Sequence, residues 1–206
     1  VVDRFFYFLR ATVLENDRLA YWWADRMMRS NAPLQEKMAL FWHGHFATGE
    51  NKIRDYRKML LQLNTLQANS LGNFGQLLTK VAQDPAMLAY LDAGENVKGS
   101  PNENFGREVM ELFTMGVGNY TEKDIREAAR AFTGWTSDDK TLKFVVLKDK
   151  HDDTPKTFLG KTGNFDGNDI LGAILEQPVT AEWVGGKIHK FFVREDQTPE
   201  MRKKVG

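Results

Sequence analysis

Apolar residues recur at three- and four-residue intervals through the first two-thirds of the chain. One run comprises Leu19, Trp22, Trp23 and Met27, and a second comprises Ile53, Tyr56, Leu60 and Leu63. This spacing places the apolar side chains of each run on one face of an α-helix. The pattern therefore predicts a series of amphipathic helices.

Helix start signals divide this region. Pro33 opens a helix that is predicted to run to about Phe46, and Asp84-Pro85 combines a capping residue with a first-turn proline. Ser100 with Glu103 three residues later, and Thr121 with Asp124, both have the spacing of a capping box. These signals predict helix starts at about residues 33, 85, 101 and 122.

The segment 142–147 (LKFVVL) breaks the helical pattern. Its β-branched and aromatic content is typical of a strand, and 156–159 (KTFL) is its expected partner. We therefore predict a mainly α, multi-helix globular domain with one small two-stranded β hairpin at about 142–159. The whole chain, 1–206, is expected to be a single domain. It starts with Val1-Val2 and no initiator Met, so we expect a fragment truncated at both ends.

Composition excludes several classes of function. The 28 Lys and Arg residues balance 28 Asp and Glu residues, so there is no net field to attract nucleic acid, and we expect no nucleic-acid partner. No stretch approaches the roughly 18 apolar residues of a membrane-spanning helix, so no membrane span is expected in this chain. The absence of cysteine excludes disulfides, thiolate metal sites and cysteine nucleophiles.

Two histidines lie in the helix predicted to begin at Pro33. At about 100° per residue, His45 falls within the apolar stripe that contains Met38 and Phe41, whereas His43 points the opposite way. The two imidazoles therefore diverge and cannot chelate one metal ion. His45 is expected to be buried and His43 more exposed. His45 is either a core histidine with one hydrogen bond or a histidine that a carboxylate orients in a cleft.

Carboxylates line the helix that follows residue 101. The apolar stripe of this helix comprises Phe105, Val109, Leu112 and Phe113, which are expected to be buried, and Glu108 and Glu111 lie beside it. Glu103 and Arg107 are four residues apart and can form an ion pair. Either this stripe is a solvated face, or a half-buried carboxylate has a raised pKa that suits it to proton transfer. We expect at least one of Glu108 and Glu111 to be buried and to have a partner from another segment. The candidate donors are His45, His151 and Arg130.

His151 lies in a polar loop where side chains from several segments can converge. Together with His45, Arg107, Glu108 and Glu111, it completes the set of candidate catalytic residues. No cofactor-binding motif and no metal-ligand motif is recognised, so no cofactor and no metal site is predicted.

Three groups of motifs resemble the bacterial domain-of-unknown-function-1800 family. They lie in 34–46, in 84–88 with 101–116, and in 120–135, and the later segments 151–160 and 187–193 follow in the same order. The resemblance covers Leu34 to about Val193. It implies that the motifs shared by the family include His43, His45, Asn102, Glu103, Arg107, Glu108, Glu111 and the pair His151-Asp152. Gly106 stands where alanine is more usual.

The resemblance implies a piece of a longer bacterial protein and an extracytoplasmic location, periplasmic or secreted. It supplies no reaction. Two hypotheses remain: a non-catalytic binding or structural module of an exported protein, with a protein or glycan partner, or an enzyme, such as a hydrolase, with a histidine–carboxylate site and an optional divalent cation. Convergence of the candidate residues in one pocket favours the enzyme, and their dispersal into caps and ion pairs favours the module.

Overall fold

The computed structural model describes the backbone of residues 2–206 and the side chains of residues 10–206. Helices dominate it, with 11 α-helices and two small antiparallel sheets among the described residues, which confirms the predicted mainly α fold. The helices are α1 (Val2–Arg29), α2 (Pro33–His45), α3 (Glu50–Ile53), α4 (Tyr56–Asn69), α5 (Phe74–Ala82), α6 (Pro85–Tyr90), α7 (Asn104–Glu108), α8 (Glu122–Ala131), α9 (Gly167–Leu175), α10 (Pro178–Phe192) and α11 (Pro199–Val205).

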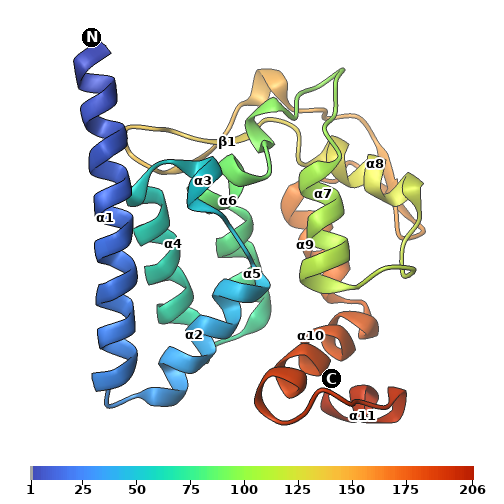
Figure 1. Cartoon of the computed structure of the whole chain (residues 1–206). Helices are drawn as coiled ribbons and strands as arrows, with labels where there is room; N and C mark the ends of the chain where they lie inside the picture. The colour runs from blue at the N-terminus through green and yellow to red at the C-terminus, as the bar shows by residue number, and fades with distance from the viewer. Residues whose placement is uncertain (1) are drawn as a thin grey trace.

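The helices form two groups that share the main core, and a smaller cluster of Trp23, Ala39 and Leu63 joins α1 to α2 and α4. Helix α1 stands at one side against α2 and α4, and α5 and α6 pack on α4, while α7 to α11 form the other side (Figure 1). Helix α5 packs on α9 and so joins the two groups. The buried core draws on both and includes Leu66, Leu77, Met87, Phe105, Met110, Phe132 and Trp135. None of the described helices is long and apolar enough to cross a membrane.

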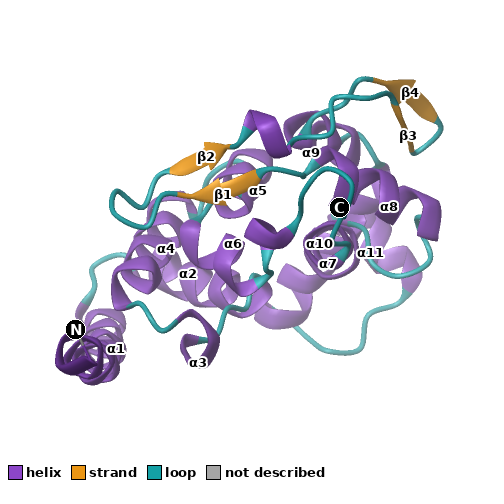
Figure 2. Ribbon diagram, turned by 90° about the horizontal axis from the view of Figure 1, so that it is seen from above, coloured by secondary structure: helices purple, strands orange, loops and turns teal. Residues whose placement is uncertain are grey.

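The β structure differs from the predicted single hairpin. Strand β1 (Trp135–Ser137) pairs with β2 (Phe144–Val146), and β3 (Lys156–Phe158) pairs separately with β4 (Lys161–Gly163). The predicted strands therefore both exist, but the predicted pairing of 142–147 with 156–159 is wrong. In Figure 2 the two sheets lie apart, β1–β2 near α5 and β3–β4 at the edge of the molecule beyond α8.

Local turns explain the two separate sheets. The Asp138 carboxylate accepts the N–H groups of Lys140 and Thr141, at 3.1 and 2.7 Å, and this turn returns the chain from β1 to β2. Leu159 and Gly160 both have positive φ, 46° and 79°, and form the two-residue turn between β3 and β4. Each strand therefore pairs with its neighbour in sequence.

Helix caps confirm most of the predicted starts. Asp84 accepts the N–H groups of Ala86 and Met87, and Thr121 and Asp124 form the predicted capping box. The predicted capping box at Ser100 is wrong, because α7 begins only at Asn104. The Asn96 side chain accepts the N–H of Asn102 and holds this segment as a loop.

Helix α7 continues directly into a π-helix, Val109–Thr114. Its i→i+5 hydrogen bonds wind the chain with more residues per turn than an α-helix has. The α-helical phase that predicted Leu112 on the buried stripe therefore fails, and the Leu112 side chain is 46% exposed. The carbonyl groups at the end of this π-helix meet side chains from α2 and α10.

Candidate functional site

His45 lies at the end of α2 and is 8% exposed, whereas His43 is half-buried, as the helical phase predicted. The His45 ring packs against Phe41 and Phe46. Its Nε2 lies 3.0 Å from the carbonyl oxygen of Phe113. Because a carbonyl only accepts, Nε2 carries the proton and Nδ1 is left as an acceptor. Nδ1 is buried and has no partner among the described residues.

The environment keeps the His45 imidazole neutral. Burial lowers its pKa to about 3, with a smaller contribution from the positive charge of Lys187, and the Phe113 carbonyl opposes both. Burial also lowers the pKa of His43, whose ring lies 5.3 Å from that of Trp23. A neutral His45 donates one hydrogen bond and carries no charge at pH 7.

Two consecutive carbonyl groups of the π-helix accept hydrogen bonds from other helices. Phe113 O accepts from His45 of α2, while Leu112 O accepts from Trp183 Nε1 at 3.2 Å and from Lys187 Nζ at 2.8 Å, both from α10. Carbonyl groups in the last turn of a helix lack partners within the helix and need donors from elsewhere. His45 and Lys187 therefore tie α2 and α10 to the end of the π-helix.

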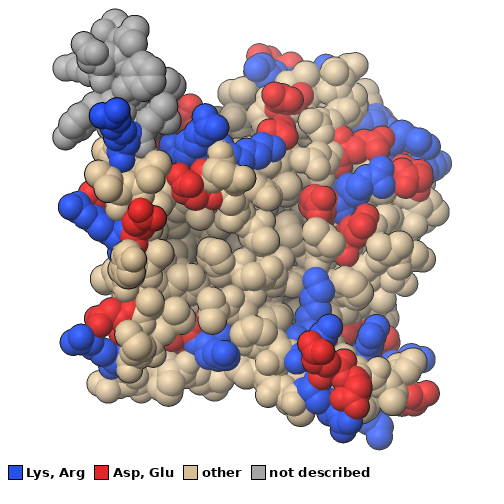
Figure 3. All heavy atoms as spheres, in the orientation of Figure 1, with Lys and Arg blue, Asp and Glu red and all other residues tan. Residues whose placement is uncertain are grey.

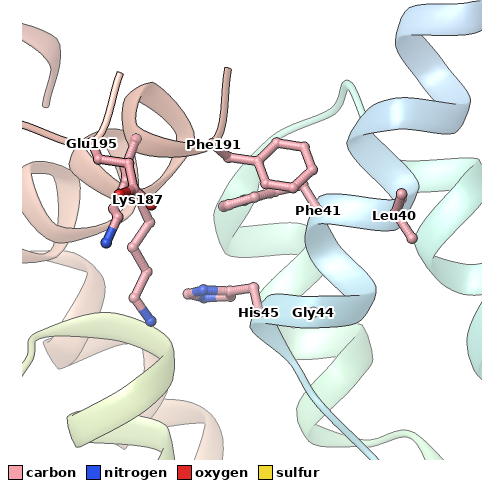
Figure 4. A pocket seen from close by; sticks show the side chains of 8 residues that line it. Leu40, Phe41, Gly44, His45, Lys187, Phe191 and Glu195 are labelled. Carbon is pink, nitrogen blue, oxygen red and sulfur yellow. The ribbon is translucent and has the colours of Figure 1, made fainter. Parts of the chain in front are cut away.

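A cavity of about 460 Å³, the α2–α10 cavity, lies between these two helices. His45 projects from α2 toward Lys187, while Phe41 and Phe191 lie together at one side (Figure 4). Neither Lys187 nor Lys190 forms an ion pair within residues 10–206. The lining residues are Leu40, Phe41, Gly44, His45, Lys187, Lys190, Phe191 and Glu195.

Arg107 and Glu111 have partners near the start of α8. Arg107 pairs with Glu103 at 3.0 Å, as its spacing predicted, and with Glu122 at 2.9 Å. Glu111 is half-buried and accepts from the hydroxyl of Tyr120 at 3.1 Å. Burial, followed by this carboxylate, raises the pKa of Tyr120 to about 12. Arg107 is therefore held by ion pairs of its own.

Glu111 has a partner from another segment, as predicted, but the predicted donors are wrong, and each carboxylate is half-buried rather than buried. Tyr120 is the partner of Glu111, and none of His45, His151 and Arg130 contacts Glu108 or Glu111 through a hydrogen bond or ion pair. Glu108 is half-buried and has neither kind of partner in the described part of the chain. Burial, with a smaller contribution from Glu111, raises its pKa.

His151 belongs to a different part of the molecule. Its Nδ1 lies 2.9 Å from the carbonyl oxygen of Thr133. The adjacent Asp152 accepts from Arg130 at 2.8 Å, and Arg130 also donates to Glu127 at 2.8 Å and to Thr154. We call Glu127, Arg130, Asp152 and Thr154 the Arg130 cluster.

Hydrogen bonds within the Arg130 cluster favour the charged form of Asp152. Burial alone would raise the pKa of Asp152, but hydrogen bonds from Arg130 and Thr154 outweigh it and lower the pKa. Lys156 is fully buried beside the cluster and donates to the carbonyl groups of Asp152 and Thr154. The cluster therefore ties β3 and its preceding loop to α8.

The five candidate residues are not brought into one network. No hydrogen bond or ion pair joins any two of His45, Arg107, Glu108, Glu111 and His151 within the described side chains. Nor does any group of three or more His, Asp and Glu side chains there have the arrangement of a metal site.

The residues that sequence reasoning missed are Lys187, Lys190 and Phe191. The available signal was that these residues follow Trp183 at intervals of three and four, which places them on one face of a helix.

Charged groups surround an uncharged centre on one face of the molecule. In the orientation of Figure 1, the face seen in Figure 3 is hollowed near its middle, and the atoms there belong mostly to uncharged residues. Lys, Arg, Asp and Glu lie toward its edges (Figure 3). Both signs of charge occur around the edge.

Comparison with known proteins gives a family but no reaction. The chain matches no curated protein and no solved structure. A family model described as "Protein of unknown function (DUF1800)" matches residues 9–206, nearly the whole chain. The family model thus agrees with the resemblance seen in the sequence motifs. The chain belongs to the DUF1800 family.

Proposed function

We propose that this chain is a non-catalytic binding module of an exported protein and that the α2–α10 cavity is its binding site. The observation that carries the proposal is the cavity itself. Its volume of about 460 Å³ lies within the range of small-ligand sites, and it combines apolar walls with a few polar groups. The exported location is supported by the family resemblance alone.

The chemistry of the candidate residues argues against catalysis. A general base works best when its pKa is near the operating pH, and a pKa of about 3 makes His45 a weak base at pH 7. Arg107 is engaged by Glu103 and Glu122. Glu108 has a raised pKa but no nucleophile, base or cation in hydrogen-bond contact with it among the described side chains. The isolated groups therefore support binding better than proton transfer.

Gly44 offers a direct test of the cavity. It lines the cavity, and a Cβ placed on it meets no atom within 4 Å. A leucine at this position would extend into the cavity with no clash at its Cβ. Gly172, in α9, is likewise helical, has the same open space where a Cβ would lie, and does not line the cavity. Gly172→Leu is therefore the matched control for Gly44→Leu.

The probe is N-phenylnaphthylamine, an uncharged aromatic dye whose fluorescence rises in apolar sites. We expect saturable binding to the parent chain and to Gly172→Leu. Gly44→Leu should weaken binding about tenfold or more, a loss of about 1.4 kcal/mol, because the new side chain occupies the cavity. Equal binding by both variants would contradict the proposal, as would a parent chain that binds neither this dye nor its sulfonated form.

A further inference from the structure

We propose that the α2–α10 cavity selects organic anions that carry an apolar body, such as an aliphatic or aromatic carboxylate. This inference rests on the proposed binding function and adds the chemical class of the ligand. It follows from the arrangement of apolar and cationic side chains around the cavity. The two kinds of side chain lie in different parts of the lining.

The apolar part comes from both helices. Leu40 and Phe41 of α2 and Phe191 of α10 line the cavity, and the two phenylalanine rings lie 5.3 Å apart. Phe191 is 41% exposed although its ring contacts Phe41. An apolar ligand body placed beside these rings would remove that surface from water, which is favourable. The aromatic pair therefore accounts for the uncharged part of the ligand.

The cationic part comes from α10. Lys187 and Lys190 are three residues apart on the helix and both line the cavity. Lys187 is half-buried, and burial lowers its pKa. Its ammonium donates one hydrogen bond, to Leu112 O, and so has two further N–H groups. Glu195 also lines the cavity but forms no ion pair with either lysine.

An anionic group of a ligand would form the ion pairs that these two lysines lack within residues 10–206. A carboxylate or sulfonate at Lys187 and Lys190 would accept charge-assisted hydrogen bonds, which are about twice as strong as neutral ones. A second cavity, of about 230 Å³, shares the same two lysines and adds Arg202 and Glu182, whose charges balance. Lys37, whose Nζ lies 5.0 Å from the centre of the Phe191 ring, adds positive charge near the aromatic side. Charge and shape therefore favour an amphiphilic anion.

Two dyes of nearly equal shape test the charge selection. Anilinonaphthalene sulfonate is the anionic counterpart of the neutral N-phenylnaphthylamine. The parent chain should bind the anionic dye about tenfold more tightly than the neutral dye. Lys190→Met should reduce this preference at least threefold, because the anionic dye loses one of its two cationic partners. Lys203→Met removes an exposed lysine of α11 that lines neither cavity and should leave both affinities unchanged.

The outcomes separate the two proposals. If neither dye binds the parent, the proposed binding function fails. If both dyes bind equally, or if Lys203→Met has the same effect as Lys190→Met, only the anion selection fails. Lys190 is exposed, so its substitution tests charge without disturbing the core, and circular dichroism of each variant checks the fold.

Competition tests whether the apolar body is needed. Decanoate should displace bound anilinonaphthalene sulfonate, because it has both a chain for the aromatic side and a carboxylate for the lysines. Decanol lacks the charge and inorganic phosphate lacks the chain, so both should displace the dye at least tenfold less effectively. Displacement by phosphate as effective as that by decanoate would overturn the inference.

Discussion

His45 lines the α2–α10 cavity, and His151 is adjacent to Asp152 of the Arg130 cluster. The two regions differ in whether their charged side chains form ion pairs within the chain. In the Arg130 cluster, Arg130 donates to Asp152, Glu127, Thr154 and the carbonyl of Pro155. Asp152 accepts in addition from the N–H and hydroxyl of Thr154. Each charge of the cluster meets a partner within the chain.

The cavity has the opposite character. Lys187 and Lys190 have no carboxylate partner, and His45 Nδ1 has no donor, among residues 10–206. Lys187 is half-buried and Lys190 is exposed, and both line the cavity, so a ligand there can reach their ammonium groups. The comparison teaches that the closed network ties segments of the backbone together, whereas the two lysines of the cavity keep N–H groups that the proposed ligand would use.

Breaking the closed network should have the largest effect on stability. Arg130→Met leaves the carboxylates of Glu127 and Asp152, 16% and 13% exposed, without their cation. Removing one partner of a buried ion pair is strongly destabilising, and partial exposure reduces the loss here to about 2–3 kcal/mol. Urea unfolding of the variant and the parent measures this change.

Arg107→Met is the matched control for Arg130→Met. Its ion pairs with Glu103 and Glu122 are more exposed, with carboxylate side chains 36% and 65% exposed. Exposed pairs contribute about 0–1 kcal/mol, so the loss should stay within that range. Equal losses in the two variants would show that the Arg130 cluster is no more closed than a surface ion pair.

The open site should respond to pH through His45. Its pKa is about 3 when folded and 6.5 in its ordinary state, so below pH 6.5 the unfolded chain binds the proton more readily. Above pH 6.5 the imidazole is neutral in both states and costs no stability. As the pH falls from 6.5 toward 3, the unfolded chain takes up the proton and the free energy of unfolding decreases. The decrease amounts to roughly 1–3 kcal/mol by about pH 4.5.

His45→Gln separates this titration from the hydrogen bond. The glutamine amide can still donate to Phe113 O, but it does not titrate. The free energy of unfolding should therefore fall less steeply between about pH 6.5 and 4.5 in the variant than in the parent. Chemical unfolding at a series of pH values measures both slopes. Identical slopes would mean that His45 is not kept neutral by burial.

Glu108 lies in neither the cavity lining nor the Arg130 cluster, and its substitution should change the free energy of unfolding least. Burial and Glu111 raise its pKa, so its charged form is disfavoured in the folded state. Glu108→Gln should leave stability at pH 7 unchanged or raise it by up to about 1 kcal/mol, and the gain should shrink as the pH falls. Thermal unfolding at two pH values measures it. A clear loss of stability would reveal a partner for this carboxylate and would revive the enzyme hypothesis.

Much of the fold could be predicted because its signals are local. Periodic apolar residues and the caps at Asp84 and Thr121 identified helices that the structure contains. The capping box at Ser100 was wrong because Asn96, a residue outside the motif, holds that segment as a loop. The sheet pairing was wrong because it depends on two turns, at Asp138 and at Leu159-Gly160, that carry no common turn dipeptide.

The site was less predictable because it depends on packing between distant segments. The helical phase correctly gave a buried His45 and a more exposed His43. It failed at Leu112, where the π-helix changes the winding. That π-helix presents Leu112 O to Lys187, 75 residues further along the chain. No spacing within one helix indicates such a contact.

Backbone amide chemical shifts, followed by NMR while decanoate is added, test the central claim most directly, because they report on both regions at once. We predict saturable shifts at the amides of Leu40, Gly44, Lys187 and Phe191, which line the α2–α10 cavity. The amides of Glu127, Arg130 and Asp152 should remain unchanged, because the Arg130 cluster is closed. Shifts centred on the Arg130 cluster, or no saturable shifts at the cavity, would contradict the account.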